Sequence, residues 1–251
     1  MTFRYFLDSE ETIVSGVGFT HFGTLHFCWL ALFVLTVVIN FFVYRKLDDH
    51  GRTRWRKIVA LALGIAEIIK ILLHIIGGTF LWDYLPLHLC GINIFLILIH
   101  AYRPSKLLNN FLYTVCIPGA MAAILFPSWT SLPLLNAFHI HSSIAHILLA
   151  MYPLVPALNG DMKPSYKMMA KCLGLLALMA IPIYGINLLL DTNFMFLMYA
   201  APNNPLYWFG QNWGSHLLGF PVIIAGVMIV MYLPMELYRK LKKEKEIPKI
   251  G

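Results

Sequence analysis

Seven long stretches of mostly apolar residues dominate the chain, and shorter polar segments separate them. The stretches lie at about residues 22–44, 57–81, 84–102, 108–126, 134–158, 167–190 and 214–238. A helix needs roughly 20 apolar residues to cross the hydrocarbon core of a bilayer, and each stretch approaches or exceeds that length. The stretches lack the strict alternation of apolar and polar residues that marks membrane β-strands. The pattern therefore predicts an all-α, polytopic membrane protein with seven transmembrane helices.

Composition supports the same fold class. Hydrophobic residues make up 59% of the chain and charged residues only 12%, whereas soluble domains carry about 25% charged residues. This excludes a soluble domain. We expect one transmembrane domain over residues 1–251, with an outer N-terminal segment at 1–21, an outer loop or lid at 191–213 and a basic cytoplasmic tail at 239–251.

The basic residues predict the orientation. Seventeen of the 19 lysines and arginines fall on one side of the membrane if there are seven spans. Cytoplasmic loops carry the excess of Lys and Arg, so we expect the N-terminus outside and the C-terminus in the cytoplasm. The net charge of +7 then reflects topology rather than nucleic-acid binding. These basic loops can touch anionic lipid.

Two features of the outer side are expected to have a role. Tryptophans 82, 129, 208 and 213 fall near the outer interface, as an aromatic belt does. The outer segment 191–213 is long, carries almost no charge, and is rich in Asn, Pro and aromatic residues. Loops of this length usually have a function, so we expect either a lid or a segment that lies in the interface.

Three ionisable residues lie inside the second apolar stretch. Glu67, Lys70 and His74 follow the spacing i, i+3, i+7, which places them on one face of a helix. Ionisable groups within the bilayer are expensive and often mark function. Two interpretations remain open: a structural ion pair that holds helices together, or a buried acid–base unit that contacts a substrate headgroup.

Histidines gather in the outer halves of the predicted spans. Of ten histidines, eight lie there: His21, His26, His74, His88, His139, His141, His146 and His216. A single helical histidine is most often a packing residue, but eight at one depth suggest a site.

The fifth apolar stretch carries the clearest stripe. His139, Ser142, Ser143 and His146 form a single stripe along it. His139 and His146 are separated by ~10 Å along the helix axis, so the two rings cannot bind one metal unaided. His141 points to nearly the opposite face from His139. A metal site assembled from several spans, for instance from His88, His146 and Glu67, is left as an alternative.

Cys90 is the candidate nucleophile. It follows Pro86, which fits the first turn of a helix, and is expected about one turn into the third span. The positive end of a helix dipole favours the nucleophilic thiolate. His88 is two residues away and points elsewhere on a regular helix, so a base would come from another span, with His146 or His139 as candidates. On spacing alone, a small buried apolar role for Cys90 is the more ordinary interpretation.

A family resemblance adds to this picture. The segment 85–90, Leu-Pro-Leu-His-Leu-Cys, together with His146 and the outer segments 192–197 and 202–205, resembles the YwaF-like family of bacterial integral membrane proteins. That family is similar to the eukaryotic transmembrane protein 164, an acyltransferase that moves a fatty acyl chain between phospholipids through a catalytic cysteine. More distantly, it resembles membrane-embedded lipid hydrolases that use a Thr and a His. The resemblance implies the nucleophile role for Cys90 and the histidine role for His88 and His146.

We therefore expect an acyltransferase or lipid hydrolase that acts on phospholipid acyl esters at the outer leaflet of a bacterial plasma membrane. Its catalytic residues would be Cys90, His146 and His88, its partners membrane phospholipid or lysophospholipid, and no cofactor or metal is expected. The predicted substrate contacts are Glu67, Lys70, His74, His139, Ser143 and Asn193. We expect the outer histidines to share one cavity with Cys90. The alternatives are a zinc-dependent seven-helix lipid hydrolase, or a transporter or sensor that uses Glu67, Lys70 and His74.

Overall fold

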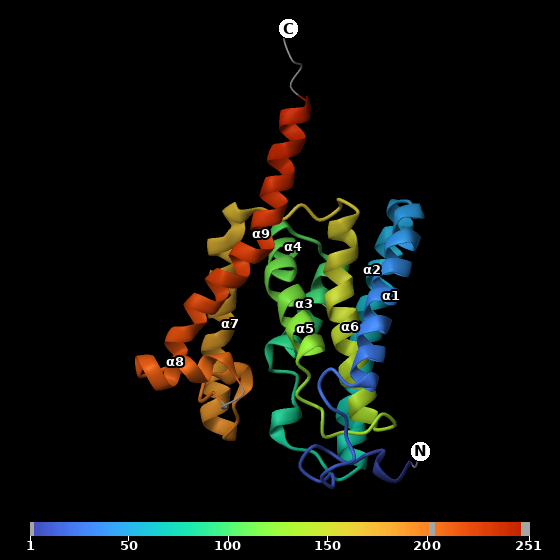
Figure 1. Ribbon diagram of the computed structural model, residues 1–251, viewed down its shortest axis with the longest axis vertical. Helices are drawn as coiled ribbons and strands as arrows, with labels where there is room; N and C mark the ends of the chain where they lie inside the picture. The colour runs from blue at the N-terminus through green and yellow to red at the C-terminus, as the bar shows by residue number, and fades with distance from the viewer. Residues whose placement is uncertain (1–2, 201–203, 247–251) are drawn as a thin grey trace.

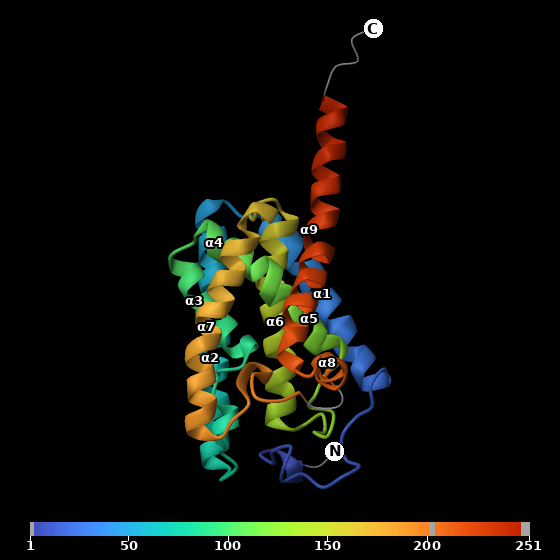
Figure 2. The same ribbon diagram turned by 90° about the vertical axis from the view of Figure 1, so that its left-hand side faces the viewer.

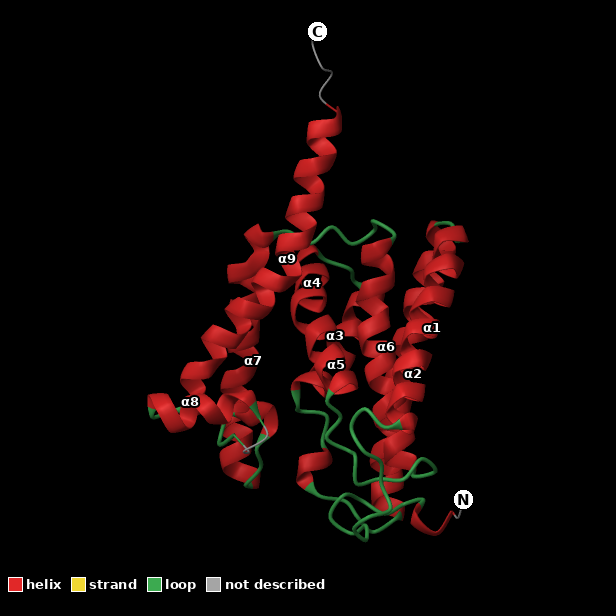
Figure 3. Cartoon of the chain, in the orientation of Figure 1, coloured by secondary structure: helices red, strands yellow, loops and turns green. Residues whose placement is uncertain are grey.

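The computed structural model describes residues 3–200 and 204–246 (Figure 1). Within this part the chain is helical, and Figure 3 shows no strand in it. In chain order the elements are η1 (Phe3–Tyr5), α1 (Thr24–Lys46), α2 (Asp49–Ile76), η2 (Trp82–Tyr84), α3 (Leu89–Tyr102), α4 (Lys106–Phe111), η3 (Leu112–Cys116), α5 (Ile117–Leu125), α6 (Ala137–Leu158), η4 (Tyr166–Met168), α7 (Met169–Leu190), η5 (Phe194–Phe196), α8 (Pro205–Trp213), η6 (His216–Leu218) and α9 (Gly219–Glu246).

Among the described residues, seven helical segments are long and apolar enough to cross a membrane. Four consist of α1, α2, α6 and the continuous run α4–η3–α5. The other three join a short helix to a long one: η2 with α3, η4 with α7, and η6 with α9. The predicted fold class is confirmed, and the protein is a multi-pass membrane protein.

The spans run alternately between two ends of the bundle (Figures 1 and 2). One end, called the N-terminal end here, holds residues 77–88, 126–136 and 191–218. The other, called the basic end, holds the connections at 47–48, 103–105 and 159–165, and α9 extends beyond it. The two termini thus lie at opposite ends, as seven spans require. Assignment of the basic end to the cytoplasm rests on the positive-inside rule and stays a prediction.

The second span begins earlier than the hydrophobic pattern predicts. The apolar pattern starts the second span at about residue 57, but α2 begins at Asp49 and the connection consists of two residues. The carboxylate of Asp48 accepts a hydrogen bond of 2.7 Å from the N–H of Gly51, which caps the helix. At the other end, Gly77 and Gly78 (φ +67°) stop the helix before the predicted residue 81.

Helix α6 is the centre of the bundle. It packs against α1, α2, α3 and α5, and these helices share the main apolar core. Helices α7 and α9 are more peripheral and contact the bundle mainly along α4 and η3. A smaller cluster of Phe111, Val115, Cys172, Met228 and Tyr232 forms that contact. The polar residues with candidate chemistry lie on α2, α3 and α6, the three helices that meet in the core.

The outer segment 191–213 is more ordered than a plain loop. It contains the turn η5 and the helix α8, which lies across the bundle rather than along it in Figure 1. Asn204 caps α8, and Pro205 occupies its first turn. The exposed Trp208 and Trp213 suit the predicted position in the membrane interface.

Some residues named in the sequence interpretation lie outside the described part of the chain. They are residues 1–2 of the N-terminal segment, residues 201–203 of the loop and residues 247–251 of the tail. The tail from residue 239 to residue 246 continues α9 as a helix.

Candidate functional site

A buried ion pair forms the centre of a polar cluster within the membrane-spanning helices. On α2, Lys70 donates a hydrogen bond to one carboxylate oxygen of Glu67. The other oxygen, Oε2, lies 3.3 Å from Nε2 of His141 on α6. The side chains of Glu67 and Lys70 are only 8% and 16% exposed. We call Glu67, Lys70, Cys90, His141 and His146 the intramembrane cluster.

Sequence reasoning did not select His141. The helical wheel correctly separates it from His139, but the wheel cannot tell which neighbouring helix each face meets. The structure places His141 against α2, and both of its ring nitrogens are buried without a well-formed hydrogen bond. The side-chain oxygen of Asn93 on α3 is also buried and unpartnered. Buried polar atoms are nearly always satisfied, so these exceptions point to a site that takes up another polar group.

Cys90 lies nearer the helix start than expected. Pro86 forms part of a turn that precedes α3, so Cys90 is the second residue of the helix rather than one turn in. Gly91 makes this close turn possible, because a Cβ at that position would lie 2.6 Å from the Pro86 backbone. No side chain caps the N-terminus of α3. Cys90 is partly buried and close enough to Glu67 to interact with it electrostatically.

His146 has one occupied and one available nitrogen. Its Nδ1 donates a hydrogen bond of 2.7 Å to the carbonyl oxygen of Ser142. This bond fixes the neutral tautomer and leaves a lone pair on Nε2. The ring stacks on Trp129 with 5.1 Å between centroids and 14° between planes. The charges of His141, Glu67 and Lys70 are close enough to His146 to act on it electrostatically.

His88 faces a different neighbour. Its ring lies 5.2 Å from that of Phe194 and 5.8 Å from that of Phe196, measured between centroids. The N–H of Met195 donates a long hydrogen bond of 3.4 Å to Nδ1 of His88. His88 therefore connects the start of α3 to the turn η5, and Lys70 is close enough to interact with it electrostatically.

Two predicted substrate contacts on α6 are engaged within the protein. Nε2 of His139 accepts a hydrogen bond of 2.8 Å from the indole of Trp29. Its Nδ1 donates one of 2.9 Å to the carbonyl oxygen of Leu132. The hydroxyl of Ser143 accepts a hydrogen bond of 3.3 Å from the indole of Trp129. His139 thus joins α1 to the loop before α6, and Ser143 holds the tryptophan on which His146 stacks.

His74 is held mainly by aromatic rings on either side of it. Its ring is stacked between Tyr84 and Phe138, with centroid distances of 3.8 and 3.6 Å. Nδ1 lies 3.0 Å from the hydroxyl oxygen of Thr79. This arrangement resembles a packing histidine that fastens the loop after α2.

Asn193 shapes the backbone of the outer segment. Its carbonyl oxygen accepts hydrogen bonds from the N–H groups of Met198 and Tyr199, and its amide donates to the carbonyl oxygen of Tyr199. Asn187 holds the preceding turn in the same way, with bonds to both the N–H and the carbonyl of Phe194. These buried amides hold a turn in which three non-glycine residues, Asp191, Met195 and Phe196, have positive φ.

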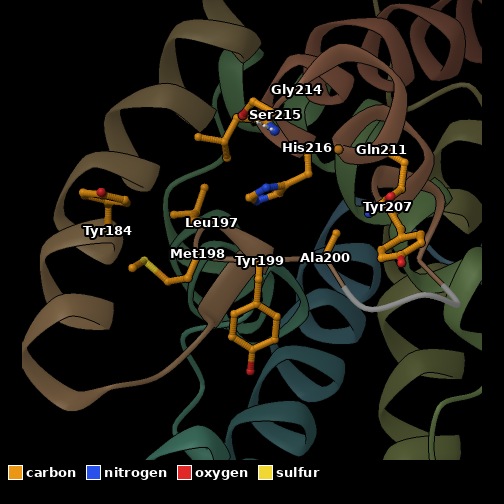
Figure 4. Close-up of a pocket in the computed structure, with 12 residues that line it drawn as sticks. Tyr184, Leu197, Met198, Tyr199, Ala200, Tyr207, Gln211, Gly214, Ser215 and His216 are labelled. Carbon is orange, nitrogen blue, oxygen red and sulfur yellow. Dashed lines mark hydrogen bonds between the residues drawn. The ribbon is translucent and has the colours of Figure 1, made fainter.

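A cavity of about 460 Å³ lies between α7, the end of η5, α8 and η6 (Figure 4). Its polar lining consists of Tyr184, Tyr199, Tyr207, Gln211, Ser215 and His216. Neither Cys90 nor His146 lines it. Cys90 and most of the outer histidines therefore do not line this cavity, and a cavity that they share stays a prediction. Of the eight, His216 belongs to it.

The described residues give no assembled metal site. Within residues 3–200 and 204–246, no three His, Cys, Asp or Glu side chains are grouped so that they could hold a metal ion. The ligand set of His88, His146 and Glu67 considered for the zinc alternative is thus not brought together there.

Comparison with known proteins bears on this cluster. The sequence model of the TMEM164 family matches residues 21–232. This range runs from just before α1 into α9 and includes every residue of the intramembrane cluster. The chain has no significant match among the curated proteins or among the solved structures.

Proposed function

Because the chain belongs to the TMEM164 family, we propose that it is a membrane-embedded acyltransferase or lipid hydrolase that acts on phospholipid acyl esters through Cys90. The proposed acceptor is a lysophospholipid or water. The proposed location is the plasma membrane of a bacterium, with the site in the outer half. The clustering of basic residues at the opposite end supports that orientation.

The observation that carries the proposal is the state of His146. A general base needs a nitrogen lone pair that no protein donor occupies. The bond from Nδ1 to the Ser142 carbonyl leaves Nε2 of His146 with that lone pair. On the same helix, Nε2 of His139 is taken by Trp29. The structure thus favours His146 over His139, the two candidates that the sequence left open.

In the proposed first step, Nε2 of His146 accepts the thiol proton of Cys90 while Sγ attacks the ester carbonyl carbon. A thioester bond forms between Sγ and the acyl carbon, and the ester bond to the glycerol oxygen breaks. The imidazolium returns the proton to that oxygen, so a lysolipid alcohol leaves. Glu67 interacts electrostatically with both Cys90 and His146, which supports placing them in one site.

The start of α3 supplies the second requirement of acyl transfer. Negative charge develops on the carbonyl oxygen in the transition state, and backbone N–H groups are frequent donors to it. The first N–H groups of a helix have no partner within the helix, and no side chain caps those of α3. Cys90, as second residue of that helix, is placed beside these donors.

The second step reverses the roles. The hydroxyl of a lysophospholipid, or water, gives its proton to Nε2 of His146 and attacks the thioester carbon. A new acyl–oxygen bond forms, the carbon–sulfur bond breaks, and the imidazolium returns the proton to Sγ of Cys90. Glu67 stabilises the imidazolium that forms in both steps, while Lys70 and His141 hold the carboxylate of Glu67 in place. His88 accepts a bond at Nδ1, so its Nε2 carries a proton and can donate to the phospholipid ester or phosphate.

The test is acyl transfer by purified protein with a phospholipid labelled in its acyl chain and a lysophospholipid acceptor. Cys90→Ala should reduce transfer and hydrolysis to background. Mass spectrometry of the unmodified protein should show a peptide containing Cys90 with a bound acyl group that hydroxylamine removes.

Cys28→Ala is the matched control, because Cys28 is an exposed cysteine on α1 and lies outside the intramembrane cluster. It should retain full activity. Undiminished transfer by folded Cys90→Ala protein would rule out Cys90 as the nucleophile.

A further inference from the structure

The cavity beneath α8 lies at the depth of lipid headgroups. Trp208 and Trp213 on α8 are 56% and 49% exposed. Tryptophan side chains prefer the boundary between headgroups and acyl chains. The cavity that α8 borders therefore opens where headgroups lie. Its volume of about 460 Å³ falls in the range of small-molecule sites.

Four of the six polar side chains that line the cavity have no hydrogen-bond partner in the described part of the chain. The hydroxyls of Tyr184, Tyr199 and Tyr207 and the amide of Gln211 make no hydrogen bond to the described part of the chain. Each can both donate and accept. Figure 4 shows Tyr184 and Tyr207 on opposite sides of the cavity, with the ring of His216 between them.

The electrostatics of the cavity disfavour an anion. No Lys, Arg, Asp or Glu is among its lining residues. Phosphate sites usually contain Arg or Lys, or the N-terminus of a helix. The C-terminal part of α8 lines the cavity through Gly210 and Gly214, and the start of η6 lines it through Ser215 and His216, so the opposite partial charges of the two helix ends offset each other.

The arrangement also differs from a cation site. An aromatic cage holds a cation against closely gathered ring faces. The tyrosines here are spread around the cavity in Figure 4, and no carboxylate among the lining residues balances a positive charge. Neutral groups that donate and accept, combined with apolar ring faces, match a ligand that has many hydroxyls and no charge.

We propose that this cavity binds an uncharged, hydroxyl-rich group of the sugar or glycerol class, carried by a lipid at the outer surface of the bundle. The wall of the cavity leads toward α3. Nε2 of His216 donates a hydrogen bond of 3.0 Å to the carbonyl oxygen of Phe196, and the ring of Phe196 lies against that of His88. A headgroup held here positions its lipid beside the turn η5. The inference stands whether or not Cys90 is the nucleophile.

The experiment measures binding rather than turnover. Full-length protein in phosphatidylcholine nanodiscs is titrated with three probes: glucosyl-diacylglycerol, phosphatidic acid and free glucose. Native mass spectrometry counts the bound molecules. Glucosyl-diacylglycerol should bind more tightly than phosphatidic acid. If free glucose competes at a similar concentration, the site binds soluble polyols. If free glucose does not compete, the site binds a lipid headgroup.

Variants localise the binding. Gln211→Leu should weaken binding of glucosyl-diacylglycerol about two- to tenfold, as expected for one hydrogen bond. Adding Tyr184→Phe should weaken it further. The matched control is Asn212→Leu, since Asn212 is the exposed neighbour of Gln211 and does not line the cavity.

Equal affinity of the Gln211→Leu and Asn212→Leu proteins would overturn the proposal, as would tighter binding of phosphatidic acid. The same titration with Cys90→Ala protein separates the two hypotheses. If Cys90→Ala protein binds glucosyl-diacylglycerol but does not transfer acyl groups, both hypotheses are supported. If catalytically active protein does not prefer glucosyl-diacylglycerol over phosphatidic acid, only the cavity proposal fails.

Discussion

Substitution of the buried pair Glu67 and Lys70 tests whether the intramembrane cluster has a structural or a functional role. Their side chains are 8% and 16% exposed, so water screens neither charge well. Removing one partner of such a pair destabilises a protein by about 3–5 kcal/mol, whereas replacing both by apolar residues is close to neutral. Glu67→Leu should therefore lower the free energy of unfolding by about that amount, because Lys70 is left unpaired. The double variant Glu67→Leu/Lys70→Leu should regain most of the loss.

Thermal unfolding of purified protein in one detergent measures the difference. For a chain of this size, roughly 2–4 °C corresponds to 1 kcal/mol, so Glu67→Leu should unfold roughly 6–20 °C lower. The neighbouring Ile68 is 60% exposed on the outside of the bundle, where lipid is expected. Ile68→Leu is therefore the matched control and should change the unfolding temperature little. A Glu67→Leu protein as stable as the Ile68→Leu protein would refute the reasoning.

Activity of the double variant then decides what the pair is for. If Glu67 and Lys70 only hold α2 in place, the double variant keeps both stability and acyl transfer. We expect it to keep stability and lose transfer, because His141 loses the carboxylate that contacts it and the imidazolium of His146 loses the nearby negative charge. Full activity in the stable double variant would make the pair structural.

Four further variants test single features. His146→Ala should reduce acyl transfer about 10²- to 10⁴-fold, the usual contribution of a general base, and lower the unfolding temperature less than His139→Ala, because only one ring nitrogen of His146 is hydrogen-bonded within the protein. His139→Ala should instead destabilise the protein by about 1–3 kcal/mol, because it removes buried hydrogen bonds at both ring nitrogens; thermal unfolding measures this. Asn187→Ala should loosen the turn after α7 and speed limited proteolysis between residues 191 and 199. Gly91→Ala should shift the start of α3 away from Pro86 and lower transfer, measured in the same assay.

Controls for these variants lie on the same chain. Gly174→Ala on α7 places its Cβ in open space, so it should preserve transfer where Gly91→Ala does not. Asn212→Ala removes an exposed amide and should leave proteolysis unchanged. Equal loss of stability in the His139 and His146 variants would contradict the division of roles. An unchanged proteolysis rate for Asn187→Ala would contradict the assigned role of that amide.

Some features of the site follow from local spacing. Glu67 and Lys70 are three residues apart on one helix, so their pairing depends on geometry within α2 alone. The position of Cys90 near the start of α3 follows similarly from Pro86 and the onset of the apolar run. The precise start required the contact between Gly91 and Pro86, which apolar spacing does not encode.

The roles of the histidines depend on partners that are distant in sequence. Trp29 and His139 are separated by 110 residues, yet their bond removes His139 from the candidate bases. His141 appeared to point away from the stripe, and it does, but the face it occupies meets Glu67. A helical wheel orders residues around their own axis and says nothing about the helix on the other side.

The number of spans and their alternation follow from the apolar pattern alone, because a bilayer imposes one length and one composition on every helix that crosses it. Which imidazole nitrogen stays free, and where a cavity opens, could be read only from the packed helices. Both depend on contacts of a few ångströms between α2, α3, α6 and the segment after α7, and such contacts are set by the packing of whole helices rather than by the residues within any one of them.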